Sequence, residues 1–193
     1  ATVDLRAYQS VFIASDQPAW FYDAYRANLS RFAQFVQGGG TLWFGAAAWG
    51  YGGGDLNGTQ LPGGVRIQGP RFEEYNDVVA PEHPLVAGVP NPFYGTAASH
   101  ATFADLPADA TIIASGQSSG LPTLIAYPFG AGKVLAFGQP LEFSAQIGQD
   151  AGRILANSLP YALIAPWLTA EPLSSSVPPD GVQTIQVTAD TAG

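Results

Sequence analysis

Hydrophobic residues follow two different spacings in the first part of the chain. The run Tyr8–Ser15 is apolar, rich in β-forming residues and followed by turn residues at positions 16–18, so it predicts a short buried strand. Over Ala19–Gln37, apolar residues recur every three or four positions, which places them on one face of a helix. These positions are Tyr22, Tyr25, Leu29, Phe32 and Val36.

Three glycines separate this helix from a second apolar run. Gly38–Gly40 ends the helix, and Thr41–Gly45 reads as another buried strand. A strand, a helix and a strand in this order form the βαβ unit of a parallel sheet. The pattern therefore predicts an α/β, flavodoxin-like fold, with a mainly parallel sheet and helices on both faces.

The chain continues with strand signals and one long helical pattern. A tight turn at Pro128–Gly132 joins the last two predicted strands. A closing helix is expected over Gly148–Ile164, where Pro160 should start a new turn or kink it. The predicted strands are Asn76–Ala80, Thr111–Ser115, Thr123–Tyr127 and Lys133–Phe137.

A different pattern begins at Pro166. In Val182–Thr188, Val and Ile alternate with Gln and Thr, which is typical of a half-buried antiparallel strand. We therefore expect one α/β domain over residues 1–165 and a C-terminal β segment over 166–193. Because two strands alone are rarely stable, we expect the second domain to be truncated.

Composition narrows the range of partners. Fifteen acidic and seven basic residues give a net charge of −8, and the basic residues are scattered, so nothing could neutralise a run of phosphates. Nucleic acid is therefore not expected as a partner. The apolar runs are far shorter than the roughly 18 residues that span a bilayer, so membrane insertion is not expected either.

Cysteine and methionine are both absent. Without cysteine the chain can form no disulfide, thiolate metal site or cysteine nucleophile. The lack of oxidisable side chains suits an exported protein, so a secreted or cell-surface location is expected. The chain begins at Ala1 and enters a strand almost at once, so we expect it to be a piece of a longer protein.

Four segments resemble the class I glutamine-amidotransferase-like superfamily, in matching order over about residues 5–165. They are Tyr8–Ser15, Phe35–Gly45, Glu82–Gly88 and Gly132–Gly138. The "HP-L-x-x-G" stretch and the closing helix are similar to non-amidotransferase relatives, namely trehalose-utilisation-type domains and the trimerisation domains of some β-galactosidases. The resemblance implies the fold predicted above.

The same resemblance implies that the catalytic nucleophile is missing. Active members place a cysteine on the sharp turn after the "GG-T-L" strand, where this chain reads Gly45-Ala-Ala-Ala-Trp49. Alanine has no nucleophilic atom, so no glutaminyl thioester can form. The family's His-Pro-Glu segment matches Phe137–Glu142, with Gln139 near the expected histidine and Glu142 near the expected acid. Glutamine cannot act as a general base.

The tail resembles a second family. Pro166–Thr188 is similar to the start of Ig-like β-sandwich modules of bacterial surface proteins, which open with "P-W-L-x-x-x-P". Such modules occur in strings, so the resemblance implies a multidomain parent whose other domains are partners of this one.

Few residues are candidates for catalysis or metal binding. His100 is the one plausible general base on a loop, and Glu142 and Asp16 could complete a rebuilt pocket. Glu73-Glu74 could pair with Glu142 for glycoside hydrolysis, although solvated surface acids are the favoured interpretation. His83 precedes a proline and is expected to hydrogen-bond a turn. No zinc spacing is present, and no metal or cofactor is expected.

The glycine-rich loop Trp49–Gly64 is the candidate ligand contact. Its glycines allow close backbone approach, Trp49 and Tyr51 offer flat apolar faces, and Asp55 and Asn57 offer hydrogen bonds. Asp55-Leu-Asn-Gly58 also resembles half of a calcium loop, but the remaining ligands are missing. Alternatively, the glycines only satisfy turns and Trp49 packs down as a lid.

Two function classes remain open. The leading hypothesis is a non-catalytic binding or spacer domain of an exported multidomain bacterial protein, with carbohydrate as the candidate ligand. The rival is a hydrolase acting on carbohydrate or a related small polar substrate through His100 or Glu142. A deep cleft converging on His100, Glu142 and Asp16 would favour the enzyme.

Overall fold

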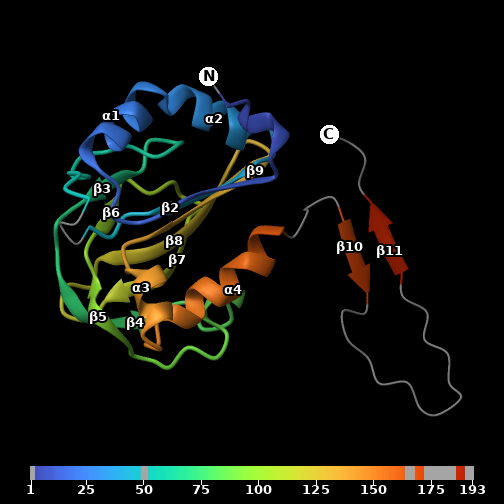
Figure 1. Cartoon of the computed structure of the whole chain (residues 1–193). Helices are drawn as coiled ribbons and strands as arrows, with labels where there is room; N and C mark the ends of the chain where they lie inside the picture. Colours follow the sequence, from blue (N-terminus) through green and yellow to red (C-terminus); the bar gives the residue numbers. More distant parts are fainter. Residues whose placement is uncertain (1–2, 49–51, 164–167, 172–185, 190–193) are drawn as a thin grey trace, which may run out of the picture. The chain divides into compact units, whose positions relative to one another are not determined.

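The structure is a computed structural model that describes residues 3–48, 52–163, 168–171 and 186–189. The chain divides into two compact units, Ala1–Ala162 and Leu163–Gly193. The first unit holds the described helices and all the described strands except β10 and β11 (Figure 1). Within the described ranges, no helix has both the length and the apolar character needed to cross a membrane.

A seven-stranded sheet forms the centre of the first unit. Its spatial order is β1-β2-β9-β8-β7-β4-β5. The pairs β1–β2 and β2–β9 are parallel, and the remaining four pairs are antiparallel. The strands are β1 (Ser10–Ile13), β2 (Thr41–Gly45), β4 (Glu73–Val78), β5 (Phe93–Ser99), β7 (Thr111–Gly116), β8 (Pro122–Phe129) and β9 (Gly132–Phe137).

The predicted α/β, flavodoxin-like fold is confirmed, although parallel pairing holds only for β1, β2 and β9. The physical reason lies in the turn between β8 and β9, where Phe129 pairs with Gly132 across two residues. A connection this short can join only antiparallel strands. Gly130 takes the left-handed φ of 65° that this turn requires.

The predicted helix over residues 19–37 is two helices, α1 (Ala19–Ala27) and α2 (Leu29–Gln37). They meet at Asn28, whose ψ of 15° leaves the helical region and whose side-chain amide donates to the carbonyl oxygen of Ala24, 2.8 Å away. Asparagine competes for backbone hydrogen bonds in this way, which apolar spacing does not reveal.

The closing helix is shorter than predicted. It is α4 (Gly152–Leu163) and contains Pro160, while a separate short helix, α3 (Leu141–Gln146), precedes it. Two 3₁₀ helices also occur, η1 (Leu5–Ala7) and η2 (Pro84–Val86). Neither they nor α3 were predicted, because segments of three to six residues show too little periodicity to identify.

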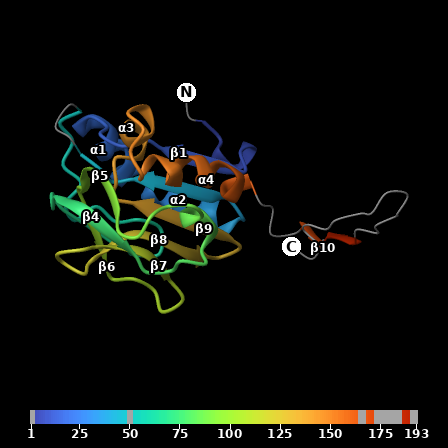
Figure 2. The same ribbon diagram turned by 90° about the horizontal axis from the view of Figure 1, so that it is seen from below.

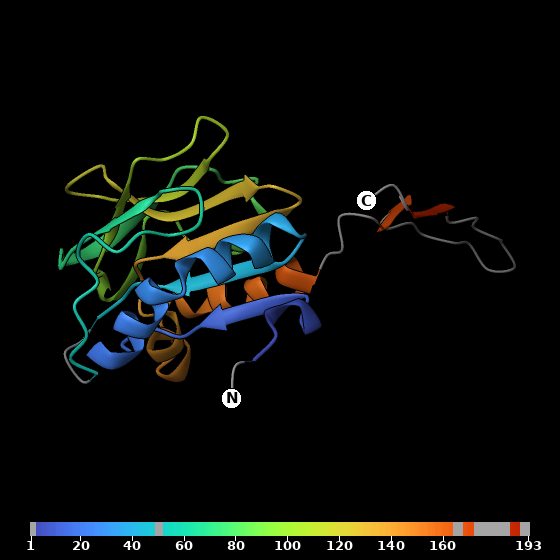
Figure 3. The same cartoon turned by 90° about the horizontal axis from the view of Figure 1, so that it is seen from above.

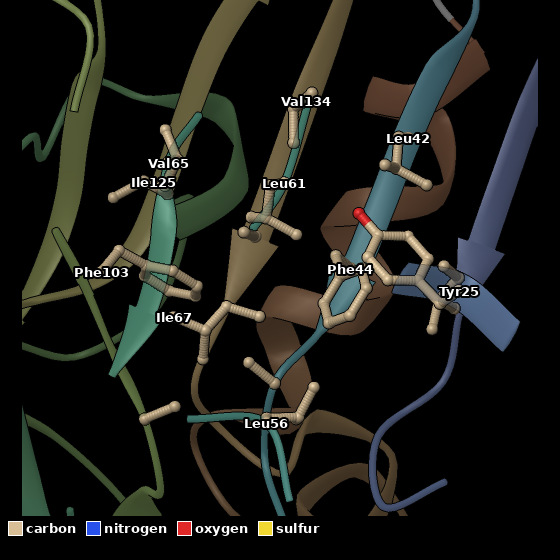
Figure 4. Close-up of a cluster of buried hydrophobic side chains, with 14 of the residues drawn as sticks. Tyr25, Leu42, Phe44, Leu56, Leu61, Val65, Ile67, Phe103, Ile125 and Val134 are labelled. Atoms are coloured by element: carbon tan, nitrogen blue, oxygen red, sulfur yellow. The ribbon is translucent and has the colours of Figure 1, made fainter. Parts of the chain in front are cut away.

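One face of the sheet is covered by α1 and α2. Tyr25 of α1 packs with its ring centroid 5.0 Å from that of Phe44 on β2. A small antiparallel sheet, β3 (Arg66–Gln68) and β6 (Thr102–Ala104), extends the same apolar cluster through Ile67 and Phe103. Figure 4 shows these four side chains within one cluster.

The other face is covered by η2 and α4, and Figures 2 and 3 show α4, in orange, on this side of the sheet. Leu85 of η2 and Ile154 of α4 are fully buried against Trp43, Leu135 and Phe137 of the sheet. Helices therefore lie on both faces, as predicted.

In the second unit, the described residues form an antiparallel pair, β10 (Leu168–Glu171) and β11 (Gln186–Ala189). The alternating residues at 182–188 thus end in a strand. The domain boundary at 165 and the Ig-like assignment of residues 166–193 stay predictions.

Two leucines provide a direct test of the sheet's role in stability. Leu42 is fully buried on β2, whereas Leu159 on α4 is 62% exposed. We expect Leu42→Ala to lower the free energy of unfolding by about 2–5 kcal/mol through lost burial and a residual cavity. Leu159→Ala should change it by less than about 0.5 kcal/mol. Urea denaturation of both variants checks this, and equal losses would contradict the assigned core.

Candidate functional site

The loops after β1, β2 and β9 meet at one edge of the sheet, the carboxyl edge of its parallel part. The backbone N–H of Asp16 donates to the carbonyl oxygen of Ala47 (2.9 Å), and that of Ala46 donates to Phe137 (2.8 Å). Ala46 and Ala47 are buried. This turn after β2, which lies where the amidotransferases that the sequence resembles have their nucleophile, is therefore held by backbone hydrogen bonds on both sides.

Gly45 is the first residue of this turn, and the structure leaves no room for a side chain at this position. A Cβ atom at this position would lie 2.6 Å from Oγ of Ser15 and 2.8 Å from its backbone nitrogen. Glycine thus lets the loop after β1 approach β2 closely at the point where ligands usually bind in sheets of this kind.

Glu142 reaches the same edge from the first turn of α3. Its Oε1 accepts a hydrogen bond from the backbone N–H of Ser15, 2.9 Å away. Its Oε2 and the Oγ of Ser15 are both buried, and neither has a hydrogen-bond partner within the described part of the chain. A buried polar atom without a partner is costly, so both atoms have unused capacity to bind a polar group.

Asp16 lies next to Ser15 and has a left-handed backbone, with φ of 56°. Burial raises the pKa of the Tyr22 hydroxyl, and the charges of Asp16 and Glu142 raise that pKa further. Both acids are therefore close to this hydroxyl. The Tyr22 hydroxyl also accepts a hydrogen bond from the backbone N–H of Gln17 (3.0 Å). The structure therefore brings Asp16 and Glu142 to one site.

His100 occupies the other side of the replaced turn. Its backbone N–H donates to Gly138 (2.7 Å), and its Nδ1–H donates to the carbonyl oxygen of Ala48 (2.9 Å), since a carbonyl can only accept. The side chain is 4% exposed and packs edge-on against Phe72. His100 thus links the loops after β2 and β9 and is enclosed by them.

Gln139, at the position where the family has histidine, lies inside the protein. Its Nε2 donates to Oδ1 of Asn76 (3.2 Å), which also accepts from the Thr123 hydroxyl (2.5 Å). All three side chains are fully buried. Sequence reasoning missed Asn76 and Thr123, because they lie on β4 and β8 and only the sheet order brings them to Gln139.

The acidic pair Glu73-Glu74 does not join the site. Oε2 of Glu73 accepts from the backbone N–H groups of Ser118 (2.9 Å) and Ser119 (3.3 Å). Four strands lie between β4, which carries Glu73, and β1, beside which Glu142 lies. At ~4.8 Å per strand spacing this exceeds the ~9.5 Å that glycosidase carboxylates allow.

The glycine-rich loop packs against the loop after β1. A Cβ atom on Gly52 would collide with the carbonyl group of Asp16, and one on Gly54 would collide with the Tyr22 ring and the oxygen of Gln17. The packing of the chain therefore requires glycine at both positions. The candidates Trp49 and Tyr51 lie outside the described residues.

Asp55 and Asn57 are exposed, and both make turn hydrogen bonds. Oδ1 of Asp55 accepts from the Asn57 backbone N–H (2.9 Å), and Oδ1 of Asn57 accepts from that of Gly69 (3.4 Å). Among the described residues, no three His, Asp or Glu side chains come together to hold a metal ion. A surface hollow of about 410 Å³ lies elsewhere, between η1 and α2.

Comparison with known proteins gives one sequence relative. No family model matches the chain. An uncharacterised protein of Clostridium acetobutylicum is 31% identical over 163 residues, which is 84% of this chain and 16% of that protein. The chain thus spans about one sixth of the length of the curated relative it matches.

Solved structures with the same fold come from several bacteria. Two cytoplasmic proteins of Salmonella typhimurium align with TM-scores of 0.55 and 0.54, each at 16% identity, over 83% and 81% of this chain and 76% and 73% of theirs. A Bacteroides uniformis protein described as ThuA-like aligns with a TM-score of 0.50 at 14% identity, over 82% of this chain and 71% of its own.

At this identity the likeness shows the fold alone. The predicted resemblance is therefore confirmed as an amidotransferase-like, ThuA-like fold. The predicted secreted or cell-surface location is wrong by this comparison, because both Salmonella proteins are described as cytoplasmic. The absence of cysteine and methionine was a poor guide to location, since a protein of a reducing compartment can also lack both residues.

Glu142 tests the architecture of the edge. Glu142→Ala removes the acceptor for the Ser15 N–H and should lower the free energy of unfolding by about 1–3 kcal/mol. Glu142→Gln keeps an oxygen acceptor and should cost less than about 1 kcal/mol. Thermal and urea denaturation of the two variants measures this difference, and equal costs would show that the hydrogen bond to Ser15 is unimportant.

Proposed function

We propose that this chain is a non-catalytic binding domain within a longer bacterial protein, and that its carboxyl edge contacts a carbohydrate or a related small polyol. The other parts of the longer protein are its partners. One observation carries the proposal: Glu142, whose Oε1 is bonded to the Ser15 backbone, and Ser15 itself each have a buried side-chain oxygen without a hydrogen-bond partner among the described residues.

A polyol matches this chemistry. A carboxylate oxygen accepts from a ligand hydroxyl, and the serine hydroxyl both donates and accepts, so one sugar hydroxyl could use both groups. The nearby charges of Asp16 and Glu142 disfavour an anionic ligand at this edge. Trp49 and Tyr51 follow the replaced turn in the sequence, so their rings are candidates to stack on a sugar face.

The residues of the turn argue against covalent catalysis of the amidotransferase type. Ala46 and Ala47 are buried and carry no reactive atom, and no cysteine exists elsewhere in the chain. His100 is enclosed, with its Nδ1–H committed to Ala48. These features support a site that binds without forming a covalent intermediate.

Ammonia release from glutamine tests the lack of amidotransferase activity. We expect no release above that of buffer, because a glutaminyl thioester cannot form without a thiolate. A coupled glutamate dehydrogenase assay measures it. Turnover that disappears in Glu142→Gln would contradict the proposal.

A glycan array followed by calorimetry tests binding. We expect micromolar to millimolar affinity, about tenfold weaker in Glu142→Gln, which corresponds to about 1.4 kcal/mol. The single variant Trp49→Ala should bind the glycan even more weakly than Glu142→Gln. Glu74→Gln, an exposed carboxylate on β4, is the matched control and should bind normally. If no glycan binds, or if Glu142→Gln binds as tightly as the unaltered protein, the domain is a spacer.

A hydrolase is the second candidate, because the hydrogen bond from the Ser15 N–H to Glu142 (2.9 Å) places this carboxylate close to Asp16, the next residue in the chain. Two carboxylates at one site are the minimal equipment for glycoside hydrolysis. Incubation with nitrophenyl glycosides separates the candidates. Nitrophenol release that requires both acids would favour the hydrolase over the binding domain.

A further inference from the structure

Three titratable side chains meet at a place remote from the carboxyl edge. His83 comes immediately before η2, Lys133 is the second residue of β9, and Tyr161 lies in the last turn of α4. Lys133 is the only lysine of the chain, and His83 is one of two histidines. The site described above uses none of these three residues.

Lys133 holds the end of α4 in two ways. Its Nζ donates to the carbonyl oxygen of Tyr161 (3.1 Å) and lies 4.1 Å from the centre of the Tyr161 ring. The last carbonyls of a helix have no partner within the helix, and a cation there also complements the helix dipole. Lys133 therefore fixes the last turn of α4 to the start of β9.

His83 completes the arrangement from the η2 side. Its Nδ1 accepts a hydrogen bond from the backbone N–H of Leu85 (3.3 Å), so in this state Nδ1 carries no proton. Its ring centroid lies 5.1 Å from that of Tyr161. The neutral imidazole thus caps η2 and packs on the same tyrosine that Lys133 contacts.

Adding a proton to His83 would disturb both contacts. A protonated Nδ1 can only donate, so it would face the Leu85 N–H with a second donor. The new positive charge would also lie close to the ammonium group of Lys133. Neither effect has compensation nearby, since no ion pair joins His83 or Lys133 to a carboxylate in the described part of the chain.

We propose that His83, Lys133 and Tyr161 form a proton-sensitive clasp that holds η2 and the last turn of α4 together at neutral pH and loosens when His83 is protonated. The first unit ends within the last turn of α4. The clasp therefore sets how firmly this end of the first unit is held to η2 and β9. It is independent of any ligand at the carboxyl edge.

The surrounding charges agree with this assignment. Burial, followed by the charge of Lys133, lowers the pKa of His83 below its ordinary value of 6.5. Burial also lowers the pKa of Lys133. From α4, the neutral Asn157 ties η2 through hydrogen bonds to Leu85 (2.9 Å) and Ala87 (3.0 Å).

Two further charged residues lie close to η2 or to His83, one in space and one in sequence. Arg153 of α4 lies next to Gly88, beyond η2, where a Cβ atom would be 3.3 Å from the guanidinium. Glu82 precedes His83 and is exposed.

The direction of the pH effect follows from the lowered pKa. A histidine whose pKa is lower in the closed clasp than in the open one favours closure fully above pH 6.5. That contribution is lost as the pH falls from 6.5 through the pKa of the closed state. The amide of Leu85 should lose protection over the same window, by up to about tenfold for each unit by which the pKa is lowered.

NMR titration of the whole chain tests the clasp. His83 should titrate below 6.5, and its signal is identified because His83→Asn leaves only His100. Hydrogen exchange of the Leu85 amide, corrected for the intrinsic rate, should speed up between pH 7 and pH 5. Asparagine keeps a side-chain acceptor for Leu85 but cannot be protonated there, so His83→Asn should abolish this pH dependence.

Lys133→Met provides the second measurement and should raise the pKa of His83. The proposal is overturned if His83 titrates at or above 6.5, or if the Leu85 amide responds to pH equally in His83→Asn. A Lys133→Met variant that folds poorly would leave both of these measurements intact, since neither depends on it.

Discussion

Every residue of β2 is buried, and this constraint determines the layout of the first unit. A strand in this position needs an apolar layer on each face, which α1 and α2 supply on one side and η2 and α4 on the other. It also needs a partner at each edge, and β1 and β9 pair with it in parallel. The carboxyl ends of three strands therefore meet at one edge, where Asp16, Ala46 and Glu142 come together.

The turn after β2 is tightly enclosed. Backbone hydrogen bonds hold it to the loops after β1 and β9, and Gly45 allows an approach that no side chain would permit. In this setting two buried alanines, Ala46 and Ala47, fill the turn. The remaining chemistry is that of Glu142 and Ser15, which suits hydrogen bonding to a neutral ligand better than bond cleavage.

Lys133 and His83 lie at the other end of the parallel strands, away from the carboxyl edge. The single lysine of the chain anchors the last turn of α4, and a half-buried histidine lies beside it. Both side chains make their present contacts with His83 neutral, so the proposed sensitivity to protons lies at this junction and not in the apolar layers. The proposed anchoring at α4 and the proposed binding at the carboxyl edge thus involve different residues of one unit.

The sequence by itself determined the buried strands near β1, β2, β8 and β9, the α/β class and the absence of a thiolate nucleophile, because local apolar runs and residue identities decide these. It did not reveal the mixed pairing, the break at Asn28 or α3, which depend on short connections and side-chain hydrogen bonds. Only the tertiary structure brought Glu142 close to Asp16 and placed Glu73 far from both. It also placed Gln139 beside Asn76, which Thr123 contacts as well. Contacts between distant strands depend on sheet order, and spacing along one chain does not encode that order.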